Sequence, residues 1–440
     1  MDQRRQPSFR TRPGGRLIGR LRVPGDKSIS HRAVMLGAIA EGTTRIKGFL
    51  RAQDCLATLK AFRAMDVCIE EDRQTGDIAI RGAGLYGLQA PQSPLDLGNS
   101  GTSMRLLAGL LCGQPFDTLL IGDVSLMHRP MQRIAEPLTR MGAAIQTSTQ
   151  GTPPLRIIGG QRLRGIEYHM PIASAQVKSS ILLAGLYAQG RTCVIEPMPA
   201  RDHTERLLAE FAYSIEQQDL KVSLQGGGRL QAAMIEVPAD ISSAAYFMVG
   251  ASIAPGSDVT LEHVGINPTR SGVIEILHRM GSNIEVSNRR MAGGEPVADI
   301  HVTSTALKGI HIPPKLVPLA IDEFPAILIA AACARGVTVL TGAEELRVKE
   351  SDRIQAMVTG LRACGINAEP TADGMIVRGG QLQGAIVDSH GDHRVAMAFA
   401  IAGLAACGDI IVRDYENIAT SFPDFVAFSK GAGLDISVEQ

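Results

Sequence analysis

The chain of 440 residues has no tryptophan, and aromatic side chains make up only 4% of it. Proteins that bind single-stranded nucleic acid stack the bases on such rings, so we do not expect a nucleic-acid partner. The 44 Lys and Arg residues balance the 44 Asp and Glu residues. No overall field therefore attracts the chain to nucleic acid or to an anionic membrane. Apolar runs such as "AILIAAACA" are too short to cross a bilayer.

Cysteine is also sparse, with seven scattered residues and no C-x-x-C pattern. An odd, dispersed set in a large chain indicates reduced, mostly buried thiols in a cytoplasmic protein. The N-terminal stretch "MDQRRQPSFRTRPGGR" is basic, but the apolar segment of a secretory signal does not follow it. We expect this stretch to be a frayed tail.

Six segments repeat one pattern along the chain. Each begins with small or polar residues typical of a helix N-cap, continues as an apolar run, stops at a glycine and resumes as a β-branched strand. Their starts recur roughly every 70 residues. The segments are 25–44, 98–118, 173–192, 239–259, 321–339 and 391–410.

A second, more charged segment with helical periodicity follows each of these runs. These segments are 54–67, 130–145, 202–215, 269–286, 349–369 and 422–438. The chain is therefore predicted to contain six β-α-β-α-β-β units in two groups of three. The first helix of each unit is apolar nearly all round and should be buried, whereas the second should form the outer layer.

Parallel buried helices would bring their N-termini together in each half. Helix N-termini carry unpaired N–H groups and a partial positive charge, so converging N-termini form an anion site. Lys and Arg at such ends are unfavourable unless an anion binds, and this kind of local conflict is typical of a functional site. The residues concerned are Lys27, Ser28, Arg32, Asn99, Gly101, Thr102, Arg105, Arg129, Ser174, Gln176, Lys178, Arg201, Asp322, Glu323, Lys349, Glu350, Arg353, Asp392, His393 and Arg394.

Three other interpretations of these residues are weaker. The stretch "VPGDKSISHR" is close to a nucleotide-binding P-loop, but Asp26 separates Gly25 from Lys27, whereas the P-loop lysine directly follows a glycine. Taken singly, Arg32 or Arg129 could form a surface salt bridge, but recurrence at equivalent positions favours a shared anion site. The "HGDHR" stretch has two histidines without a ligand set at metal spacing, so no metal is expected.

Eight stretches together resemble the 5-enolpyruvylshikimate-3-phosphate synthase family, also called 3-phosphoshikimate 1-carboxyvinyltransferase. They run through nearly the whole chain in the family's order: "VPGDKSISHRA", "LDLGNSGTSMRLLAGLL", "GDVSLMHRPM", "ASAQVKSSILLAGL", "IDEFPAILIAAA", "ELRVKESDRI", "GDHRVAMAFAIAG" and "SFPDF". The resemblance implies an α/β fold, a two-domain inside-out α/β barrel of six β-α-β-α-β-β repeats. Residues 26–238 would form one domain, on the shikimate 3-phosphate side. Residues 1–25 plus 239–440 would form the other, facing it across a cleft with a hinge near residue 240.

The resemblance also implies the reaction. The family transfers the enolpyruvyl group of phosphoenolpyruvate to the 5-hydroxyl of shikimate 3-phosphate, in aromatic amino acid biosynthesis, by addition and elimination through a tetrahedral ketal. No metal or organic cofactor takes part. Both substrates are anionic, and a dense Lys and Arg set with helix N-termini would offset their repulsion. We expect a monomer whose partners are these two small molecules, with neither nucleic acid nor membrane.

Residue roles follow from matching positions. The resemblance implies that shikimate 3-phosphate binds to Lys27, Ser28, Arg32, Ser174, Ala175, Gln176, Arg201, Asp322 and Lys349. It implies that phosphoenolpyruvate binds to Lys27, Asn99, Gly101, Arg129, Gln176, Arg353 and Arg394. Asp322 is the candidate base for the 5-hydroxyl, and Glu350, with Lys27 as a candidate partner, is the candidate for proton transfer at the methylene carbon.

Two departures from the family's better-known branch resemble its second branch, which includes members tolerant of glyphosate. Ala175 stands where that branch has a second serine, and Thr420 stands where it has a lysine, which leaves one fewer cation for the phosphate. One rival is the sister enzyme, UDP-N-acetylglucosamine enolpyruvyl transferase, which would carry a reactive cysteine on a mobile loop and Asn after the active-site Lys. Here Ser28 follows Lys27, and Cys112 lies in an apolar helical run. The other rival is a non-catalytic anion-binding paralogue, which the presence of Lys27 and Asp322 disfavours.

Overall fold

The computed structural model describes residues 7–439, which fold into two compact units. Unit 1 contains the chain up to Pro24, Ala239–Arg290 and the chain from Pro296 onward. Unit 2 contains Gly25–Pro238 and Met291–Glu295. The sequence boundaries had assigned residues 291–295 to the C-terminal domain. In the structure they group with unit 2, where the Glu295 carboxylate oxygen lies 2.6 Å from the ring nitrogen Nδ1 of the buried His203.

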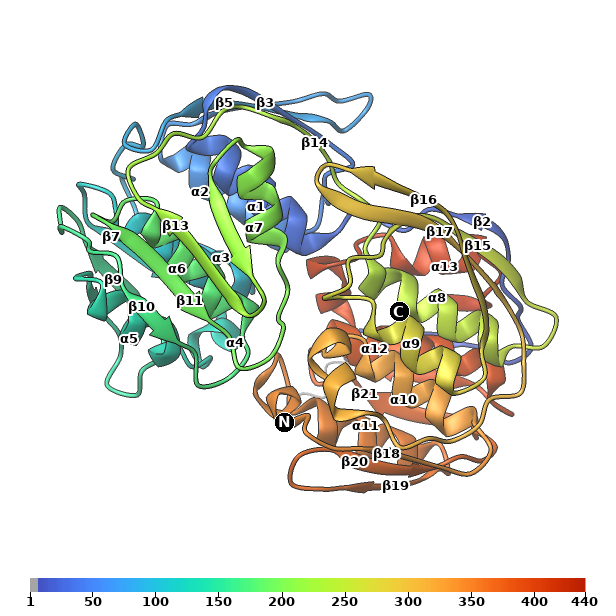
Figure 1. The fold of residues 1–440 in the computed structure, drawn as a ribbon. Coiled ribbons are helices and arrows are strands. Elements are labelled where there is room, and N and C mark those ends of the chain that lie inside the picture. The colour runs from blue at the N-terminus through green and yellow to red at the C-terminus, as the bar shows by residue number, and fades with distance from the viewer. Residues whose placement is uncertain (1–6, 440) are drawn as a thin grey trace. The chain divides into compact units, whose positions relative to one another are not determined.

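Six small sheets form the framework (Figure 1). In unit 2 they are β14 (Met234–Glu236), β3 (Glu41–Lys47), β5 (Ile78–Ala83), β4 (Cys68–Glu71); β6 (Leu95–Asp96), β7 (Thr118–Ile121), β9 (Leu155–Ile158), β8 (Ala144–Gln146); and β10 (Glu167–His169), β11 (Arg191–Ile195), β13 (Lys221–Gln225), β12 (Ile215–Gln218). In unit 1 they are β2 (Ile18–Leu21), β15 (Asp258–Gly265), β17 (Glu295–Thr303), β16 (Asn283–Ala292); β18 (Val337–Leu340), β20 (Met375–Arg378), β19 (Asn367–Pro370); and β21 (Ala385–Asp388), β22 (Ile410–Arg413), β1 (Ser8–Thr11), β23 (Ile436–Glu439).

The sheets share one topology, which is the physical form of the sequence repeat. In each four-stranded sheet the first strand pairs parallel with the second, and the second pairs antiparallel with the strand beyond it. A parallel pair needs a crossover, and in three of these sheets a buried helix supplies it: Gly101–Leu111 between β6 and β7, Ala175–Gly185 between β10 and β11, and His393–Ala402 between β21 and β22. In the three-stranded sheet, single parallel bridges at Lys308 and His311 take the place of the first strand.

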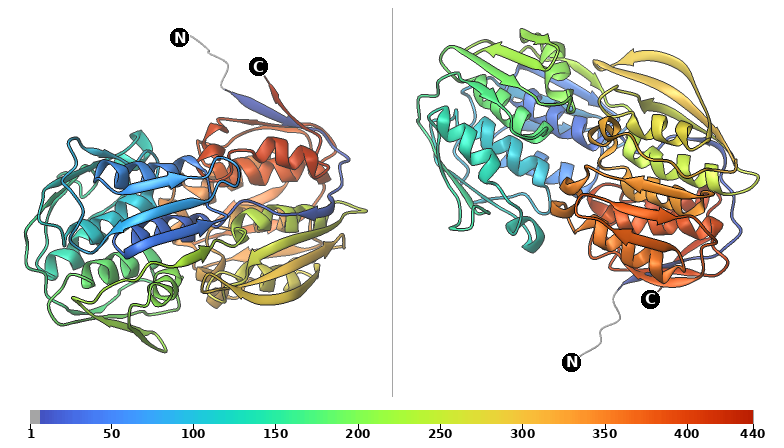
Figure 2. Two further views of the ribbon diagram at one scale, coloured as in Figure 1. Left: turned by 90° about the horizontal axis from the view of Figure 1, so that it is seen from above. Right: turned by 60° about the horizontal axis from the view of Figure 1, so that its bottom comes forward.

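Three sheets are completed by strands from distant parts of the sequence. β14 pairs with β3 in unit 2, and in unit 1 β2 pairs with β15 while β1 lies between β22 and β23. Figure 2 shows the N-terminal strand beside the C-terminal strand. The expectation of a frayed N-terminal tail is therefore wrong for residues 8–11. Phe9 and Thr11 point into the core, and Arg10 pairs with Asp409 and Glu439. The first six residues of that predicted tail lie outside the described residues.

Each unit has three buried helices packed against one another. They are α1 (Lys27–Ala38), α3 (Gly101–Leu111) and α6 (Ala175–Gly185) in unit 2, and α8 (Ile241–Ile253), α10 (Phe324–Cys333) and α12 (His393–Ala402) in unit 1. Nearly every residue of these helices is buried, as their all-round apolar sequences predict. In five of them a side-chain oxygen caps the N-terminus, from Asp26, Ser100, Ser174, Asp240 and Asp392.

A second set of helices is buried on one face only. They are α2 (Gln53–Ala64), α5 (Gln132–Arg140), α7 (His203–Glu210), α9 (Gly272–Arg279), α11 (Arg353–Ala363) and α13 (Phe425–Gly431). A short helix α4 (Val124–Met127) precedes α5. Five 3₁₀ turns complete the described part: η1 (Pro314–Leu316), η2 (Pro318–Ala320), η3 (Glu344–Val348), η4 (Gly403–Ala405) and η5 (Glu416–Thr420). Each unit has its own apolar core, formed by both sets of helices and the inner faces of its sheets.

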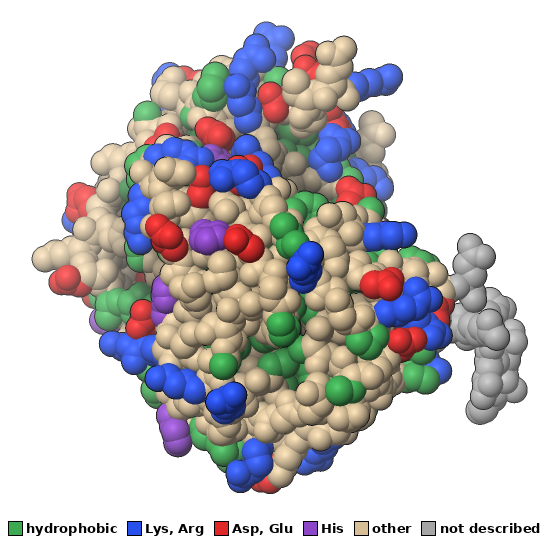
Figure 3. Space-filling model, turned by 90° about the vertical axis from the view of Figure 1, so that its right-hand side faces the viewer, with side chains coloured by type: hydrophobic (Ala, Val, Ile, Leu, Met, Phe, Trp, Pro, Cys, Tyr) green, Lys and Arg blue, Asp and Glu red, His purple; other side chains and the backbone are tan. Residues whose placement is uncertain are grey.

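Charge on the exterior agrees with the neutral composition. On the face in Figure 3, acidic and basic side chains are interspersed. Across residues 7–439, none of the helices is both long and apolar enough to cross a membrane.

Glycines at or directly after the ends of β5, β13 and β20 allow the buried helices to approach three sheets closely. A Cβ on Gly82, Gly226 or Gly379 would lie 2.1, 2.0 or 1.7 Å from the carbonyl oxygen of Ala40, Ala188 or Ala334, respectively. Each of these carbonyls follows the C-terminal end of a buried helix. The same close approach thus recurs in three repeats, and only glycine allows it.

Gly226→Ala should destabilise the protein, because the added Cβ forces α6 away from its sheet. We expect a loss of about 1–3 kcal/mol in the free energy of unfolding. Urea unfolding measures it, with Gly431→Ala as the matched control, since a Cβ there meets nothing within 4 Å. Equal unfolding midpoints for the two variants would contradict the predicted clash.

Candidate functional site

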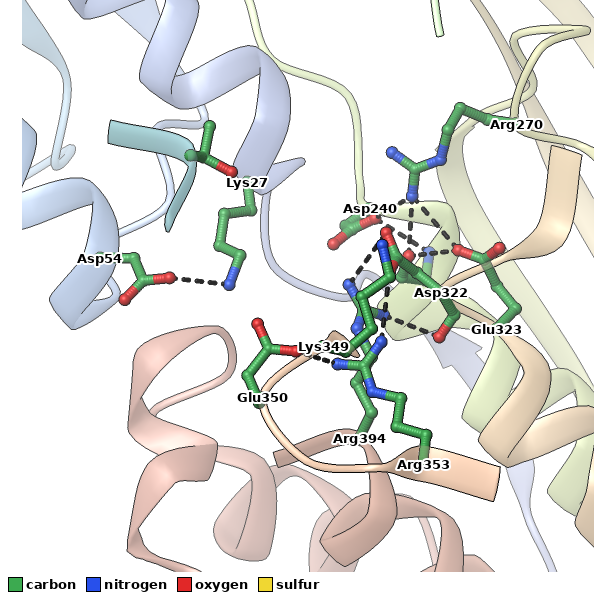
Figure 4. A network of polar contacts seen from close by, with 12 residues as sticks. Lys27, Asp54, Asp240, Arg270, Asp322, Glu323, Lys349, Glu350, Arg353 and Arg394 are labelled. Carbon is green, nitrogen blue, oxygen red and sulfur yellow. Dashed lines mark hydrogen bonds and ion pairs between the residues drawn. The ribbon is translucent and has the colours of Figure 1, made fainter. Parts of the chain in front are cut away.

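The candidate residues of unit 2 gather at the N-termini of its buried helices. Lys27 is the first residue of α1, and its ammonium lies 2.9 Å from the Asp54 carboxylate at the start of α2 (Figure 4). Both side chains are largely buried. Ser28 follows in the same turn, and its carbonyl accepts a hydrogen bond from Arg32 at 3.0 Å.

Arg32 is a buried cation whose hydrogen bonds go to uncharged oxygens. Its guanidinium donates to the Thr204 hydroxyl at 2.7 Å, to the Ser179 hydroxyl at 2.8 Å and to the Ser28 carbonyl. Within residues 7–439, none of its hydrogen bonds goes to a carboxylate. Burial lowers the pKa of Arg32 to about 10, so it stays charged at neutral pH. A buried charge without a contacting counter-ion is unfavourable by itself and is suited to an anionic ligand.

A polar chain links the N-terminal parts of α1, α2 and α3. The His31 ring nitrogen Nδ1 lies 2.8 Å from the Thr58 hydroxyl, which lies 2.7 Å from the Ser103 hydroxyl. Burial, together with the neighbouring cations Lys27 and Arg32, lowers the pKa of His31 well below its ordinary value. His31 is therefore neutral and serves to hold the helices that carry the cations.

The start of α3 presents Asn99 and Gly101 next to Arg129. The Arg129 guanidinium donates to the Asn99 amide oxygen at 2.6 Å, and the Asn99 amide donates to Asp123 at 2.7 Å. A Cβ on Gly101 would lie 2.9 Å from an Arg129 nitrogen and 2.8 Å from one of Arg105. Glycine therefore lets two guanidinium groups approach the first turn of this helix.

At the start of α6, Ser174 caps the helix, Ala175 is its first residue, and the Gln176 amide donates to the Thr102 hydroxyl at 2.8 Å. Arg201 precedes α7 and is close enough to Arg32 to contribute to lowering its pKa. The sequence analysis had grouped Lys178 with the anion-site cations. That grouping is wrong, because Lys178 is 1% exposed and ion-paired with Glu196 and Glu205.

In unit 1, the Arg353 guanidinium contacts three carboxylates, and Figure 4 shows its contact with Glu350. The guanidinium lies 2.8 Å from Asp392, 3.3 Å from Asp322 and 2.5 Å from Glu350. Burial alone lowers the pKa of this fully buried arginine, but attraction to Asp392 and Glu350 outweighs it, so the pKa is raised. The two candidate acid–base residues thus contact the same guanidinium.

Arg394 approaches Asp322 from the start of α12. Its guanidinium donates to the Asp322 carbonyl at 3.1 Å and lies 3.7 Å from the Asp322 carboxylate. The pKa of Arg394 is raised, because attraction to Asp322 outweighs the opposing effect of burial. Lys349, on the loop before α11, lies 3.6 Å from Glu345.

One buried cluster escaped the sequence analysis. Arg270, just before α9, donates to the Ser242 hydroxyl at 2.7 Å and lies 3.3 Å from Glu323 and 3.5 Å from Asp240. It ties the start of α8 to the start of α10, where Asp322 lies. A signal existed, because arginines also occur at the starts of three other second helices, at Arg129, Arg201 and Arg353. Asp54, at the start of α2, was missed in the same way.

Two further positions bear on the chemistry. Thr420 is buried, and its hydroxyl donates to the Asn417 carbonyl at 2.7 Å. It supplies no positive charge where the better-known branch of the family has a lysine. Cys112 is buried at the C-terminal end of α3, where burial raises the pKa of its thiol to about 12. A thiol in this state is not the reactive cysteine of the sister enzyme.

Among the described residues, one group has metal-ligand geometry, with Asp202, His203 and Glu295 offering atoms within 4.8 Å of one another. The Arg206 guanidinium lies 2.9 Å from Asp202 and 3.9 Å from Glu295. Arg206 supplies positive charge to this group, which therefore resembles a buried ion-pair cluster.

Buried cations at helix N-termini, with carboxylates beside them, are the arrangement expected of an enzyme that acts on small anionic substrates. Residues 11–428 match the family model described as EPSP synthase (3-phosphoshikimate 1-carboxyvinyltransferase). The 3-phosphoshikimate 1-carboxyvinyltransferases of Nitrosococcus oceani and Methylococcus capsulatus are 65% and 64% identical to the chain. The alignments cover 98% of this chain in both cases, and 96% and 98% of the relatives. A solved EPSP synthase structure from Acinetobacter baumannii is 57% identical, with a TM-score of 0.88 over 99% of this chain and 100% of that one.

The chain belongs to the EPSP synthase family. It transfers the enolpyruvyl group of phosphoenolpyruvate to the 5-hydroxyl of shikimate 3-phosphate and releases phosphate, a step of the shikimate pathway to aromatic amino acids. These relatives also confirm the expected fold, the two-domain inside-out α/β architecture of the enolpyruvyl transferases.

Neutral, buried His31 should make stability depend on pH. Its ordinary pKa is 6.5 and its folded pKa is lower, so below pH 6.5 the unfolded chain binds the proton first and stability falls. Between pH 7.5 and 5.5, we expect the melting temperature of His31→Gln to fall by less than that of the wild type. His169→Gln, the same change at an exposed histidine, is the control and should retain the wild-type dependence. Identical losses for all three proteins would refute this role of His31.

Proposed function

We propose that the two substrates bind to the cations at the helix N-termini of the two units. Shikimate 3-phosphate would bind to Lys27, Ser28, Arg32, Ser174, Ala175, Gln176, Arg201, Asp322 and Lys349. Arg32 carries the proposal, because its buried guanidinium contacts three uncharged oxygens and, within residues 7–439, hydrogen-bonds to no carboxylate. Arg32 would take the substrate carboxylate, and Ser174 with Gln176 would hold the phosphate and ring.

Phosphoenolpyruvate would bind to Lys27, Asn99, Gly101, Arg129, Gln176, Arg353 and Arg394. Guanidinium groups suit this ligand, because their planar N–H pairs match carboxylate and phosphate oxygens. The contacts of Arg353 add a condition. Its nitrogens already contact Asp392, Asp322 and Glu350. We infer that Glu350 leaves the Arg353 nitrogen when an anionic substrate contacts it, which would release Glu350 for proton transfer.

The reaction would use two carboxylates in separate roles. The Asp322 carboxylate would accept the proton of the 5-hydroxyl of shikimate 3-phosphate. The oxygen of that hydroxyl would at the same time attack C2 of phosphoenolpyruvate. The methylene carbon would gain a proton by way of Glu350, with Lys27 as its partner, which gives the tetrahedral ketal. Loss of a proton from the new methyl group and departure of phosphate would then restore the enol ether. The contacts of Asp322 with Arg353 and Arg394 support this assignment, because they fix the carboxylate.

Phosphate release from phosphoenolpyruvate plus shikimate 3-phosphate tests the assignment of the base. Asp322→Asn should lower kcat by about 100-fold or more, the usual contribution of a general base. Asp409→Asn, the same change at a partly exposed ion pair with Arg10, should leave kcat unchanged. UDP-N-acetylglucosamine serves as the parallel acceptor and should give no release. Wild-type kcat in Asp322→Asn would remove Asp322 from this role.

Gly101→Ala should weaken binding of phosphoenolpyruvate. The added Cβ lies within 3 Å of both guanidinium groups, so Arg129 must shift from its position beside Asn99. We expect the KM for phosphoenolpyruvate to rise about tenfold, equivalent to about 1.4 kcal/mol. The KM for shikimate 3-phosphate should stay nearly constant. An unchanged KM for phosphoenolpyruvate would contradict the assignment of Gly101 to the phosphoenolpyruvate site.

We also propose that the protein acts as a monomer in the cytoplasm. All seven cysteines are free thiols, as is usual in a reducing compartment. Light scattering on the purified protein, with and without substrates, measures the mass.

A further inference from the structure

A buried four-charge cluster lies beside the proposed shikimate 3-phosphate residues. The Lys178 ammonium on α6 lies 2.8 Å from the Glu196 carboxylate, which directly follows β11, and 2.7 Å from the Glu205 carboxylate on α7. Glu205 is also the strongest attraction that acts on the charge of Arg32. Two cations and two carboxylates thus lie in one region, where all four side chains are at most 7% exposed, and the two carboxylates contact Lys178.

This cluster encloses the loop that carries Arg201. The loop runs from Glu196 to Asp202 between β11 and α7. The Lys178 ammonium also donates to the Ala200 carbonyl at 3.3 Å, one residue before Arg201. Lys178 therefore contacts the start of the loop, its last turn and the helix that follows.

The neighbouring residues connect the same elements to Arg32. Ser179 follows Lys178, and Thr204 precedes Glu205; their hydroxyls lie 2.7 Å apart, and both accept hydrogen bonds from Arg32. Any shift of α7 relative to α6 would move the two hydroxyls that accept hydrogen bonds from the Arg32 guanidinium. Two side-chain contacts therefore connect α6 and α7: the ion pair of Lys178 with Glu205, and the hydrogen bond of Ser179 with Thr204.

Stability alone does not explain a buried lysine here. Burying an ammonium and two carboxylates costs several kcal/mol per ion, and apolar residues of similar volume often stabilise a core as well or better. The attraction of Glu205 and Glu196 outweighs the effect of burial on Lys178 and raises its pKa, so the charge is kept. A retained buried ion cluster can specify one geometry, which here is the geometry of a binding surface.

We propose that Lys178 is a positioning residue for shikimate 3-phosphate. It fixes α6, the 196–202 loop and α7 so that Arg32 and Arg201 are held where this substrate binds, without contacting the substrate itself. The inference rests on the proposed assignment of Arg32 and Arg201 to shikimate 3-phosphate.

Steady-state kinetics with each substrate varied in turn test it. Lys178→Met should raise the KM for shikimate 3-phosphate about tenfold and change the KM for phosphoenolpyruvate less than about twofold. Lys178→Arg, which keeps the charge, should restore most of the affinity. Lys221→Met is the matched control, since it removes an exposed lysine paired with Glu167 in the same unit. It should change neither KM.

A purely structural role predicts another result: a lower melting temperature and less active enzyme, with both KM values unchanged. That result, or an equal rise of both KM values, overturns the proposal. Glu205→Gln removes one carboxylate with almost no change of shape and covers the case in which Lys178→Met fails to fold. It should raise the KM for shikimate 3-phosphate a few-fold, and an unchanged value overturns the proposal.

Arg32→Gln and Arg201→Gln separate this inference from the proposed function. If both raise the KM for shikimate 3-phosphate while the Lys178 and Glu205 variants do not, the assigned binding residues stand and the positioning role fails. If neither raises it, the assignment itself fails, and the positioning role fails with it.

Discussion

The structure depends on one electrostatic constraint, which is the placing of positive side chains at helix ends that are already positive. Six buried helices begin with unpaired N–H groups, and the chain puts lysine or arginine beside most of these ends. In unit 1 the constraint is met from within, since Arg353 and Arg394 contact the carboxylates of Asp322, Glu350 and Asp392. In unit 2, the hydrogen-bond partners of Arg32 among the described residues are hydroxyl and carbonyl oxygens. A bound anion is the natural completion of such a site.

The repeat architecture explains how the constraint arises. The four-stranded sheets order their strands in the same way, and three of the buried helices end at the same kind of glycine-limited contact with a sheet. Helices built this way expose equivalent first turns, and one substitution in a first turn yields one site residue. The second helices do the same with Arg129, Arg201, Arg270 and Arg353. Binding groups for two substrates can therefore come from repetition of a single unit, with local variation in the side chain.

In the proposed assignment, proton transfer and substrate binding take place in two different electrostatic environments. Proton transfer needs carboxylates held in fixed positions, and Asp322 and Glu350 share the guanidinium of Arg353. Substrate binding needs cations that are not already saturated by carboxylates, and Arg32 with its hydroxyl shell meets that need. The acids and bases of the chain balance overall, so this division is local and leaves no imprint on the net charge.

The sequence by itself determined the six repeats, the buried and half-buried helices, and the cations at the helix starts, because each depends on periodicity or on caps within a few residues. The family resemblance added the roles. Only the tertiary structure decided which charges meet. Lys178 resembled the other helix-start cations, yet it points to Glu196 and Glu205, which follow it by 18 and 27 residues. Arg270 contacts Glu323, 53 residues later in the sequence. β1 lies in a stretch that the sequence predicted to be a frayed tail, yet it is an inner strand of a sheet whose other strands come from the C-terminal part of the chain. Long-range pairings of this kind depend on where the folded backbone places each side chain, and no local pattern in the sequence encodes that position.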